Sequence, residues 1–506
     1  MRRRAARNHT NRIRLEHNTD LALTSCVAAE SISPAKRHTM HSNSLLRQPS
    51  ANIAQCLSTF AVDLNVGTLP ESVWNKSVHH IVDAIGLAFA SHHFPFAAPG
   101  LRGIRAAAGS GEATVIGSDA RLAPRDAALA NGYLIHGLDF DDTHPASIVH
   151  PSVACLPTAL ALAEATNATW GELIAAYVAG METAIRLGRA VKGGFHHVGF
   201  HATGIVSHFS SAVVAGKLLG LTADQITCAQ GIAASTASGV QVFLEDGAWT
   251  KRMHPGWGAL AGITAAYMAQ AGFAGPKRPY EGRFGLIDTH LQELAGQVDA
   301  DSAIDGLGTT WTMLDTSIKP FPVCHFIHGC AEAALQLRRE LGPDAKIERI
   351  VCELPEATLP IVAEPASAKI VPKSDYEGKF SAQFVVAACF ARNRFTLGEL
   401  DDNSLRDPEI LSLAAKTECV KEVDSRFPTY FSGAVTVTLA DGRTLRAHVP
   451  MNLGSGARAL SLAEIQEKFR GNAGLTLSDT RASAVLDALL SAGPDTPVRD
   501  VTRVLG

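Results

Sequence analysis

The sequence predicts a mainly α fold, in which a helical domain is interrupted by a smaller α+β domain. Three observations predict this arrangement. Helical patterns fill residues 52–315, short strands mixed with helices follow over residues 316–449, and helical patterns return over residues 450–506. The chain has 506 residues, which exceeds what one hydrophobic core usually holds and therefore also favours two domains.

The first part of the chain, residues 1–51, differs in composition from the rest. Six arginines lie within its first fourteen residues, acidic residues are few, and Ser, Asn and Thr are frequent. A mitochondrial transit peptide has this composition. However, no clean amphipathic helix is present, and Met40 offers a second start. We therefore expect a disordered or mis-started tail on a cytoplasmic protein, with a mitochondrial location as the alternative.

Helices are expected in order along residues 52–315. In Pro70–Ser91 the apolar residues recur at helical spacing, and Pro70 suits a first turn. Capping-box sequences that begin at Thr169 and at Thr222 each open another helix. Ala-rich stretches such as residues 158–165 carry small side chains on several faces, which suits helices packed closely in an all-α domain.

The next part, residues 316–449, mixes strands with helices. Ile347–Leu354 predicts a strand, and Ala434–Leu439 runs through Asp441-Gly442 into Thr444–Val449, which predicts a β-hairpin. Helical segments lie between these strands, so this part is α+β. Helical patterns return after Pro450 and continue to the end of the chain.

Composition excludes several classes of partner. The formal net charge is −4 with no sustained basic stripe, so nucleic acid and anionic membranes are not expected as partners. No stretch approaches the roughly 18 uninterrupted apolar residues of a membrane span. The nine cysteines are scattered and form no CxxC pair, which favours a reducing compartment over a disulfide framework.

Four clusters combine ionisable side chains with Gly and Pro, which predict loops or helix ends. Residues 131–152 hold three aspartates within four positions beside several histidines, and such aspartates repel one another unless partners neutralise them. Residues 195–204 place histidines at the start of an Ala-rich helix, where an imidazolium is disfavoured and a neutral base becomes available. Residues 247–256 and 318–330 add two lysines, an arginine and more histidines.

Each cluster also has an ordinary structural explanation. The aspartates suit a solvated turn, a single histidine suits a satisfied core position, and residues 247–256 suit a solvated basic turn. The Asp and His residues also suggest a metal site, as do Cys324, His325, His328 and Cys330. The cysteine spacing fits no common zinc module, and no HExxH pattern supplies further ligands. We therefore expect no metal.

Taken together, the four clusters favour proton-transfer chemistry on an anionic substrate. Cationic side chains bind carboxylates, and neutral imidazoles move protons near pH 7. Proton abstraction next to a carboxylate, followed by loss of water or CO₂, needs only such groups, and ammonium groups stabilise the developing anion. The chain contains no nucleotide, flavin or thiolate signature. We therefore expect a cofactor-independent enzyme whose partner is a small polycarboxylate substrate.

The four clusters, in this order, resemble the MmgE/PrpD family. The segments that carry the resemblance are residues 131–143, 201–204, 251–256 and 319–325, and the resemblance spans about residues 52–500. The family includes 2-methylcitrate dehydratase, cis-aconitate decarboxylase and an iminodisuccinate epimerase. The resemblance implies a large all-helical domain formed by both ends of the chain, an inserted smaller α+β lid domain, a homodimer, and neither a metal nor an organic cofactor.

The resemblance also implies the residues of the site. Carried over by position, the pocket comprises Asp139, Thr143, His150, His201, Lys251, His254, Lys319 and His325. The two lysines, with His254 and His325, are expected to bind the substrate. His150 and His201 are candidates for proton transfer, while Asp139 and Thr143 are expected to orient the substrate or an adjacent histidine.

The leading hypothesis from the sequence is a hydro-lyase that dehydrates a citrate-like tricarboxylate, such as 2-methylcitrate or another alkylcitrate. Decarboxylation of cis-aconitate to itaconate is the first alternative, because the same pocket would serve it. An epimerase of an amino or imino dicarboxylate and a catalytically silent polycarboxylate-binding protein are the others.

Overall fold

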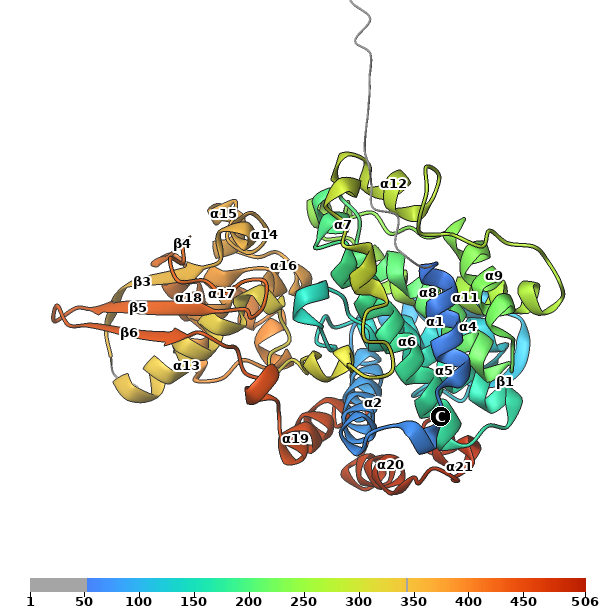
Figure 1. The fold of residues 1–506 in the computed structure, drawn as a ribbon. Helices are drawn as coiled ribbons and strands as arrows, with labels where there is room; N and C mark the ends of the chain where they lie inside the picture. The colour runs from blue at the N-terminus through green and yellow to red at the C-terminus, as the bar shows by residue number, and fades with distance from the viewer. Residues whose placement is uncertain (1–51, 343–344) are drawn as a thin grey trace, which may run out of the picture. The chain divides into compact units, whose positions relative to one another are not determined.

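The computed structural model describes residues 52–342 and 345–506. Over these residues most of the chain is helical and the strands form two small sheets (Figure 1), which confirms the mainly α fold predicted from the sequence. The predicted tail, residues 1–51, lies outside the described residues. The domain boundaries predicted near residues 316 and 450 stay predictions.

Over residues 52–315, the first part of the described chain, there are twelve α-helices. They are α1 (Ile53–Asp63), α2 (Glu71–Ser91), α3 (Ala97–Ala107), α4 (Pro124–His136), α5 (Ser152–Thr166), α6 (Trp170–Ala190), α7 (Gly194–His197), α8 (Ala202–Leu218), α9 (Ala223–Ala234), α10 (Phe243–Asp246), α11 (Thr250–Gln270) and α12 (Leu286–Leu291). A small antiparallel pair, β1 (Ser110–Thr114) and β2 (Arg121–Leu122), lies between α3 and α4. The sequence did not predict this pair, because β1 lacks the aromatic and most of the β-branched residues that favour strands.

After residue 316 the chain alternates between helices and strands and then returns to helices. The elements are α13 (His328–Leu341), β3 (Ile347–Leu354), α14 (Leu359–Val362), α15 (Ala366–Ile370), α16 (Asp375–Lys379), α17 (Ala382–Arg392), α18 (Pro408–Ala414), β4 (Thr417–Lys421), β5 (Gly433–Leu439), β6 (Thr444–Val449), α19 (Leu462–Ala473), α20 (Asp479–Ser491) and α21 (Val498–Thr502). The predicted strand and hairpin are β3 and the β5–β6 pair.

Side-chain caps begin the helices where the sequence predicts them. Thr169 precedes α6, and its hydroxyl accepts a hydrogen bond from the backbone N–H of Glu172, whose carboxylate accepts one from Thr169 in return. Thr222 and Gln225 form the same capping box at α9. Each cap satisfies backbone donors that a helix leaves unpaired at its start. Pro70, expected in a first turn, directly precedes α2.

Glycines let α4, α8 and α11 approach closely. A Cβ built on Gly132 of α4 would lie 2.7 Å from the Cα of Gly256 in α11. A Cβ built on Gly262, further along α11, would lie 2.6 Å from Ser211 of α8. Because these contacts leave no room for a side chain, the glycines bring the end of α4 against the beginning of α11. Arg252 of α11 donates to the carbonyl of Gly137 at 2.7 Å, which fixes this junction.

The larger sheet has the strand order β4-β3-β5-β6. β4 runs parallel to β3, while the β3–β5 and β5–β6 pairs are antiparallel. Gly442 adopts φ 85° in the turn between β5 and β6, a conformation that glycine reaches without strain. Helix α13 packs on β5 and β6 (Figure 1). The sequence did not predict β4, a short edge strand of five residues that includes the charged Glu418 and Lys421.

Buried apolar side chains gather in separate clusters. One lies among the helices before residue 316 and those after residue 460, and another lies around the larger sheet with α13 and α17. Among the helices of the described ranges, none has the length and apolarity required to cross a membrane.

Candidate active site

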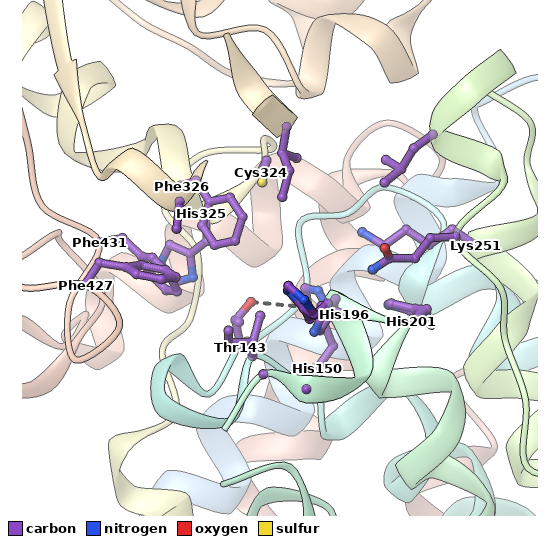
Figure 2. A pocket seen from close by; sticks show the side chains of 18 of the residues that line it. Thr143, His150, His196, His201, Lys251, Cys324, His325, Phe326, Phe427 and Phe431 are labelled. Atoms are coloured by element: carbon purple, nitrogen blue, oxygen red, sulfur yellow. Dashed lines mark hydrogen bonds between the residues drawn. The ribbon is translucent and has the colours of Figure 1, made fainter. Parts of the chain in front are cut away.

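A cavity of about 660 Å³ brings most of the predicted site residues together (Figure 2). Seven of the eight residues named from the sequence line it: Asp139, Thr143, His150, His201, Lys251, Lys319 and His325. The eighth, His254, lies against His201, with the two Nδ1 atoms 3.2 Å apart. Segments far apart in the sequence therefore meet at one site.

The loop after α4 carries Asp139 into this cavity. Asp139 adopts φ 52°, in the left-handed region that Asp enters more readily than most residues. Further along the loop, Thr143 and Ser317 exchange two backbone hydrogen bonds of 2.9 Å. This exchange holds the segment that carries Lys319 beside the loop that carries Asp139.

Lys251 reaches the cavity from the first turn of α11. The segment 247–256, considered above as a solvated basic turn, instead contains the start of this helix, and both Lys251 and Arg252 are buried. Pro255 lies within the helix. The basic residues are therefore part of a buried site and not of an exposed turn.

Asp139 bridges the two lysines of the site. Its Oδ1 lies 2.9 Å from Nζ of Lys251 and 3.2 Å from Nζ of Lys319, and Lys319 also donates to the Asp139 carbonyl at 2.7 Å. Burial favours the neutral acid, but the two ammonium groups outweigh it and hold the pKa of Asp139 below its usual value. Two cations thus share one carboxylate, which leaves one positive charge beside the cavity.

A second aspartate, Asp141, joins two imidazoles. Its Oδ2 lies 3.0 Å from Nδ1 of His136 and 3.0 Å from Nδ1 of His150. Burial opposes the charge of Asp141, yet the two imidazoles hold its pKa well below the usual value. Asp141 and His136 lie within the cluster of residues 131–152 described from the sequence, but the sequence assigned neither of them a role in the site. Three aspartates within four positions carry no signal that tells which one faces which partner.

The contacts of His150 fix its tautomer. Its Nδ1 faces the Asp141 carboxylate and, at 2.8 Å, the carbonyl of Asp142, both of which only accept hydrogen bonds. Nδ1 must therefore carry the proton, and the neutral ring has its lone pair on Nε2. Nε2 lies 3.8 Å from Oδ1 of Asp139. His150 thus presents a basic nitrogen beside the lysine-bound carboxylate.

Neutral imidazoles line the other side of the polar part of the cavity. His201 directly precedes α8, as the sequence predicted, and burial followed by the charge of Lys251 lowers its pKa well below the usual value. Burial likewise lowers the pKa of His196 and of His254 to about 4. Among the described residues, Nε2 of His201 is buried and has no hydrogen-bond partner, and His201 itself lines the cavity.

Two further buried groups, which the sequence did not single out, support the site. Lys379 donates to the carbonyl of Leu138 at 2.7 Å, and burial lowers its pKa to about 8. The Nδ2 of Asn452 lies 2.8 Å from Nε2 of His325, and because an amide nitrogen only donates, that histidine nitrogen accepts. These contacts fix the backbone before Asp139 and the ring of His325.

One group of potential metal ligands occurs in the described part of the chain, namely His136, Asp141 and His150. Its atoms lie at hydrogen-bond distances, with one carboxylate oxygen between two ring nitrogens that can both donate. Hydrogen bonds account for this arrangement completely. The absence of a metal expected from the sequence stays a prediction.

Aromatic side chains line the remaining part of the cavity. Phe326, Phe427 and Phe431 contact one another with ring centroids 5.5–5.9 Å apart, and we call these three residues the aromatic wall. Figure 2 shows the aromatic wall beside His325, across the cavity from His196, His201 and Lys251. The cavity therefore has a charged, histidine-rich part and an apolar part.

Comparisons with known proteins agree with this arrangement of residues. The chain matches the MmgE/PrpD N-terminal domain over residues 55–295 and the MmgE/PrpD C-terminal domain over residues 321–492. It is 29% identical over 455 residues to the cis-aconitate decarboxylase of Homo sapiens, a match that covers 86% of this chain and 90% of that protein.

Two other relatives match over much of the chain. The cis-aconitate decarboxylase-like protein oryM of Aspergillus oryzae is 26% identical over 477 residues, covering 90% of this chain and 98% of that protein. The 2-methylcitrate dehydratase of Cupriavidus necator is 28% identical over 405 residues, covering 75% of this chain and 81% of that protein. The two domain matches, over most of the described chain, show that this protein belongs to the MmgE/PrpD family, as the four sequence clusters predicted.

Proposed function

We propose that this chain is a lyase that acts on a citrate-like tricarboxylate and that it releases CO₂ from a substrate of the cis-aconitate type. The observation that carries the proposal is the pair of ammonium groups that shares Asp139 beside Nε2 of His150. The surplus positive charge suits a substrate carboxylate, because charge-assisted hydrogen bonds are the stronger kind in a buried site.

The proposed reaction needs one bond broken and one proton delivered. The bond between the substrate carbon and the departing carboxylate breaks, CO₂ leaves, and the electron pair spreads through the adjacent double bond to form an allylic anion. A retained conjugated carboxylate spreads this charge toward Lys251 and Lys319, which stabilise it. His150, after taking up a proton from solvent at Nε2, gives this proton to the far carbon of the allylic anion, so that the double bond shifts and the neutral ring is restored.

Similarity to known enzymes supports CO₂ release over loss of water. The human decarboxylase and the oryM protein match 86% and 90% of this chain, against 75% for the 2-methylcitrate dehydratase. The sequence alone favoured dehydration, and this stays the second candidate. The dehydratase similarity supports it, and so does His201, because a dehydration needs an acid for the leaving hydroxyl besides a base for the carbon-bound proton.

A substrate screen tests the proposal. The purified full chain is incubated in D₂O with cis-aconitate, citrate and 2-methylcitrate, and the products are identified by mass spectrometry. We expect loss of CO₂ with one deuterium bound to carbon in the product. Loss of water without CO₂ would favour the second candidate. Deuterium uptake at carbon without loss of CO₂ or water would identify an epimerase. Binding without turnover would contradict any lyase.

A further inference from the structure

The cavity has room beyond a citrate-like group. Its volume is about 660 Å³. A tricarboxylate of the size of cis-aconitate has twelve non-hydrogen atoms, and even at the ~30 Å³ that each water molecule takes up in the liquid these would fill only about 360 Å³. Bonded atoms lie closer than water molecules, so the true figure is smaller. A large part of the cavity is therefore left over once the polar group is bound.

The space left over adjoins the aromatic wall. Lys251, Lys319 and the histidines belong to the polar part, together with Lys192, Gln241 and Gln297. The aromatic wall lies across the cavity from His196, His201 and Lys251 (Figure 2). Ala357 and Ile361, which also line the cavity, add apolar atoms to it. A carboxylate bound there would lose its hydration without gaining a cation or a donor from the aromatic wall.

Packing within the protein explains only part of the aromatic wall. Phe431 is fully buried and lies with its ring 4.4 Å from that of His325, so it supports a site residue. Phe326 and Phe427 are only half-buried, although both line the cavity. These two rings leave apolar surface in contact with whatever fills the cavity, and an apolar group is the occupant that gains most from that contact.

We infer that the substrate carries an apolar substituent longer than a methyl group, which packs against the aromatic wall while the carboxylates bind at Lys251 and Lys319. This inference rests on the proposed function and names its substrate class: tricarboxylates of the citrate or cis-aconitate type that bear an alkyl or aryl chain. The aromatic wall would then set the specificity of the enzyme.

A chain-length series tests the inference. The full chain is assayed with cis-aconitates and citrates that carry methyl, propyl, butyl or hexyl substituents, beside the unsubstituted compounds. We expect kcat/KM to rise about fourfold for each added methylene until the aromatic wall is covered, as burial of one methylene group predicts. A kcat/KM that is highest for the unsubstituted compound would overturn the inference and leave the proposed function intact.

Matched variants assign the effect to the aromatic wall. Phe427→Ala is expected to lower the ratio of kcat/KM for hexyl over methyl substrates about tenfold. Phe284→Ala removes the same ring from a position that is 80% exposed and outside the cavity lining, and it is expected to leave this ratio unchanged. An unchanged ratio in Phe427→Ala would contradict the role of the aromatic wall.

A binding measurement separates the two proposals if no compound is turned over. In that case the proposed function fails, and thermal stabilisation by alkyl-substituted tricarballylates, which have neither a hydroxyl group nor a double bond, still tests the inference. Stabilisation that grows with chain length in the wild type and less in Phe427→Ala supports it. Stabilisation that is independent of chain length overturns it.

Discussion

At the residue scale, Asp141 determines the ring orientation and the tautomer of His150. Its carboxylate lies 3.0 Å from Nδ1 of both His136 and His150. An ionised acceptor at Nδ1 fixes the ring orientation and leaves Nε2 as the nitrogen that exchanges a proton. Asp141 itself does not line the cavity, so we assign it a positioning role.

Asp141→Asn is expected to lower kcat by roughly 10²–10⁴-fold with little change in KM, because an amide can stabilise the wrong tautomer and carries no charge. The alkaline limb of the kcat profile should move to lower pH, since the imidazolium that donates the proton loses its counter-charge. Steady-state kinetics across pH measure both effects. Asp141→Glu should restore part of kcat, and Asp402→Asn at an 82% exposed site should change neither parameter. An unaltered pH profile in Asp141→Asn would argue for a purely structural aspartate.

The sequence could predict which polar residues form the site, but not how its aspartates are paired or which aromatic residues line it. The family resemblance carried by four ordered clusters implied eight site residues, of which seven line one cavity. Asp139 and Asp141 could not be assigned to their partners, because the choice depends on the left-handed backbone at Asp139, which turns adjacent carboxylates toward different neighbours. The aromatic wall was missed because its three rings come from segments about one hundred residues apart.

At the element scale, the contact between α4 and α11 holds the site together. The loop that carries Asp139 follows α4, and Lys251 lies in the first turn of α11. The distance of 2.9 Å between Oδ1 of Asp139 and Nζ of Lys251 depends on how closely the two helices cross. Gly132 and Gly256 make that crossing possible, since each Cβ would meet backbone of the other helix.

Gly132→Ala is expected to lower the free energy of unfolding by about 1–3 kcal/mol, although Ala favours helices, because the new Cβ would lie 2.7 Å from the Cα of Gly256. Activity should fall as well, since a displacement of about 1 Å at a reacting group can cost 10²-fold. Chemical denaturation and kinetics measure these effects. Gly103→Ala is the matched control, because an added Cβ there meets nothing within 4 Å, and it should stabilise by up to ~1 kcal/mol. Equal effects of the two variants would refute the account.

The sequence was most informative about elements with a strong local signal. The capping boxes at Thr169 and Thr222 begin α6 and α9, and the Asp441-Gly442 turn joins β5 to β6. β4 depends on its neighbour instead, because its five residues gain strand geometry by pairing with β3. Such tertiary pairing leaves little trace in the sequence.

At the scale of the whole molecule, many histidines are buried in the neutral form. Burial lowers the pKa of His136, His196 and His254 to about 4, while an unfolded chain keeps the ordinary value of 6.5. Asp83 has the opposite effect on the free energy of unfolding. Burial raises its pKa to about 6, so as the pH falls the folded protein binds this proton before the unfolded chain does. Because more histidines than aspartates are affected, the histidines determine the direction of the change.

The homodimer and the cytoplasmic location expected from the sequence stay predictions.

The free energy of unfolding is therefore expected to fall as the pH drops from about 6.5 toward 4. In that window the unfolded chain binds protons that the folded protein excludes, which favours unfolding. Thermal melting at pH 8, 7, 6 and 5 measures the trend. A melting temperature that rises from pH 6.5 to pH 5 would contradict neutral burial of these histidines.

We propose that Lys251 and Lys319 together bind and stabilise the carboxylates of a substrate that loses CO₂. The measurement that tests it most directly is turnover of the best tricarboxylate found, by CO₂ release, in the wild type and in a Lys251→Ala, Lys319→Ala double variant. The exposed Lys277→Ala serves as the control. We predict a loss of at least about 10³-fold in the double variant, since each lost donor to a developing oxyanion costs 10²–10³-fold. Turnover by the double variant at the wild-type rate would contradict the account.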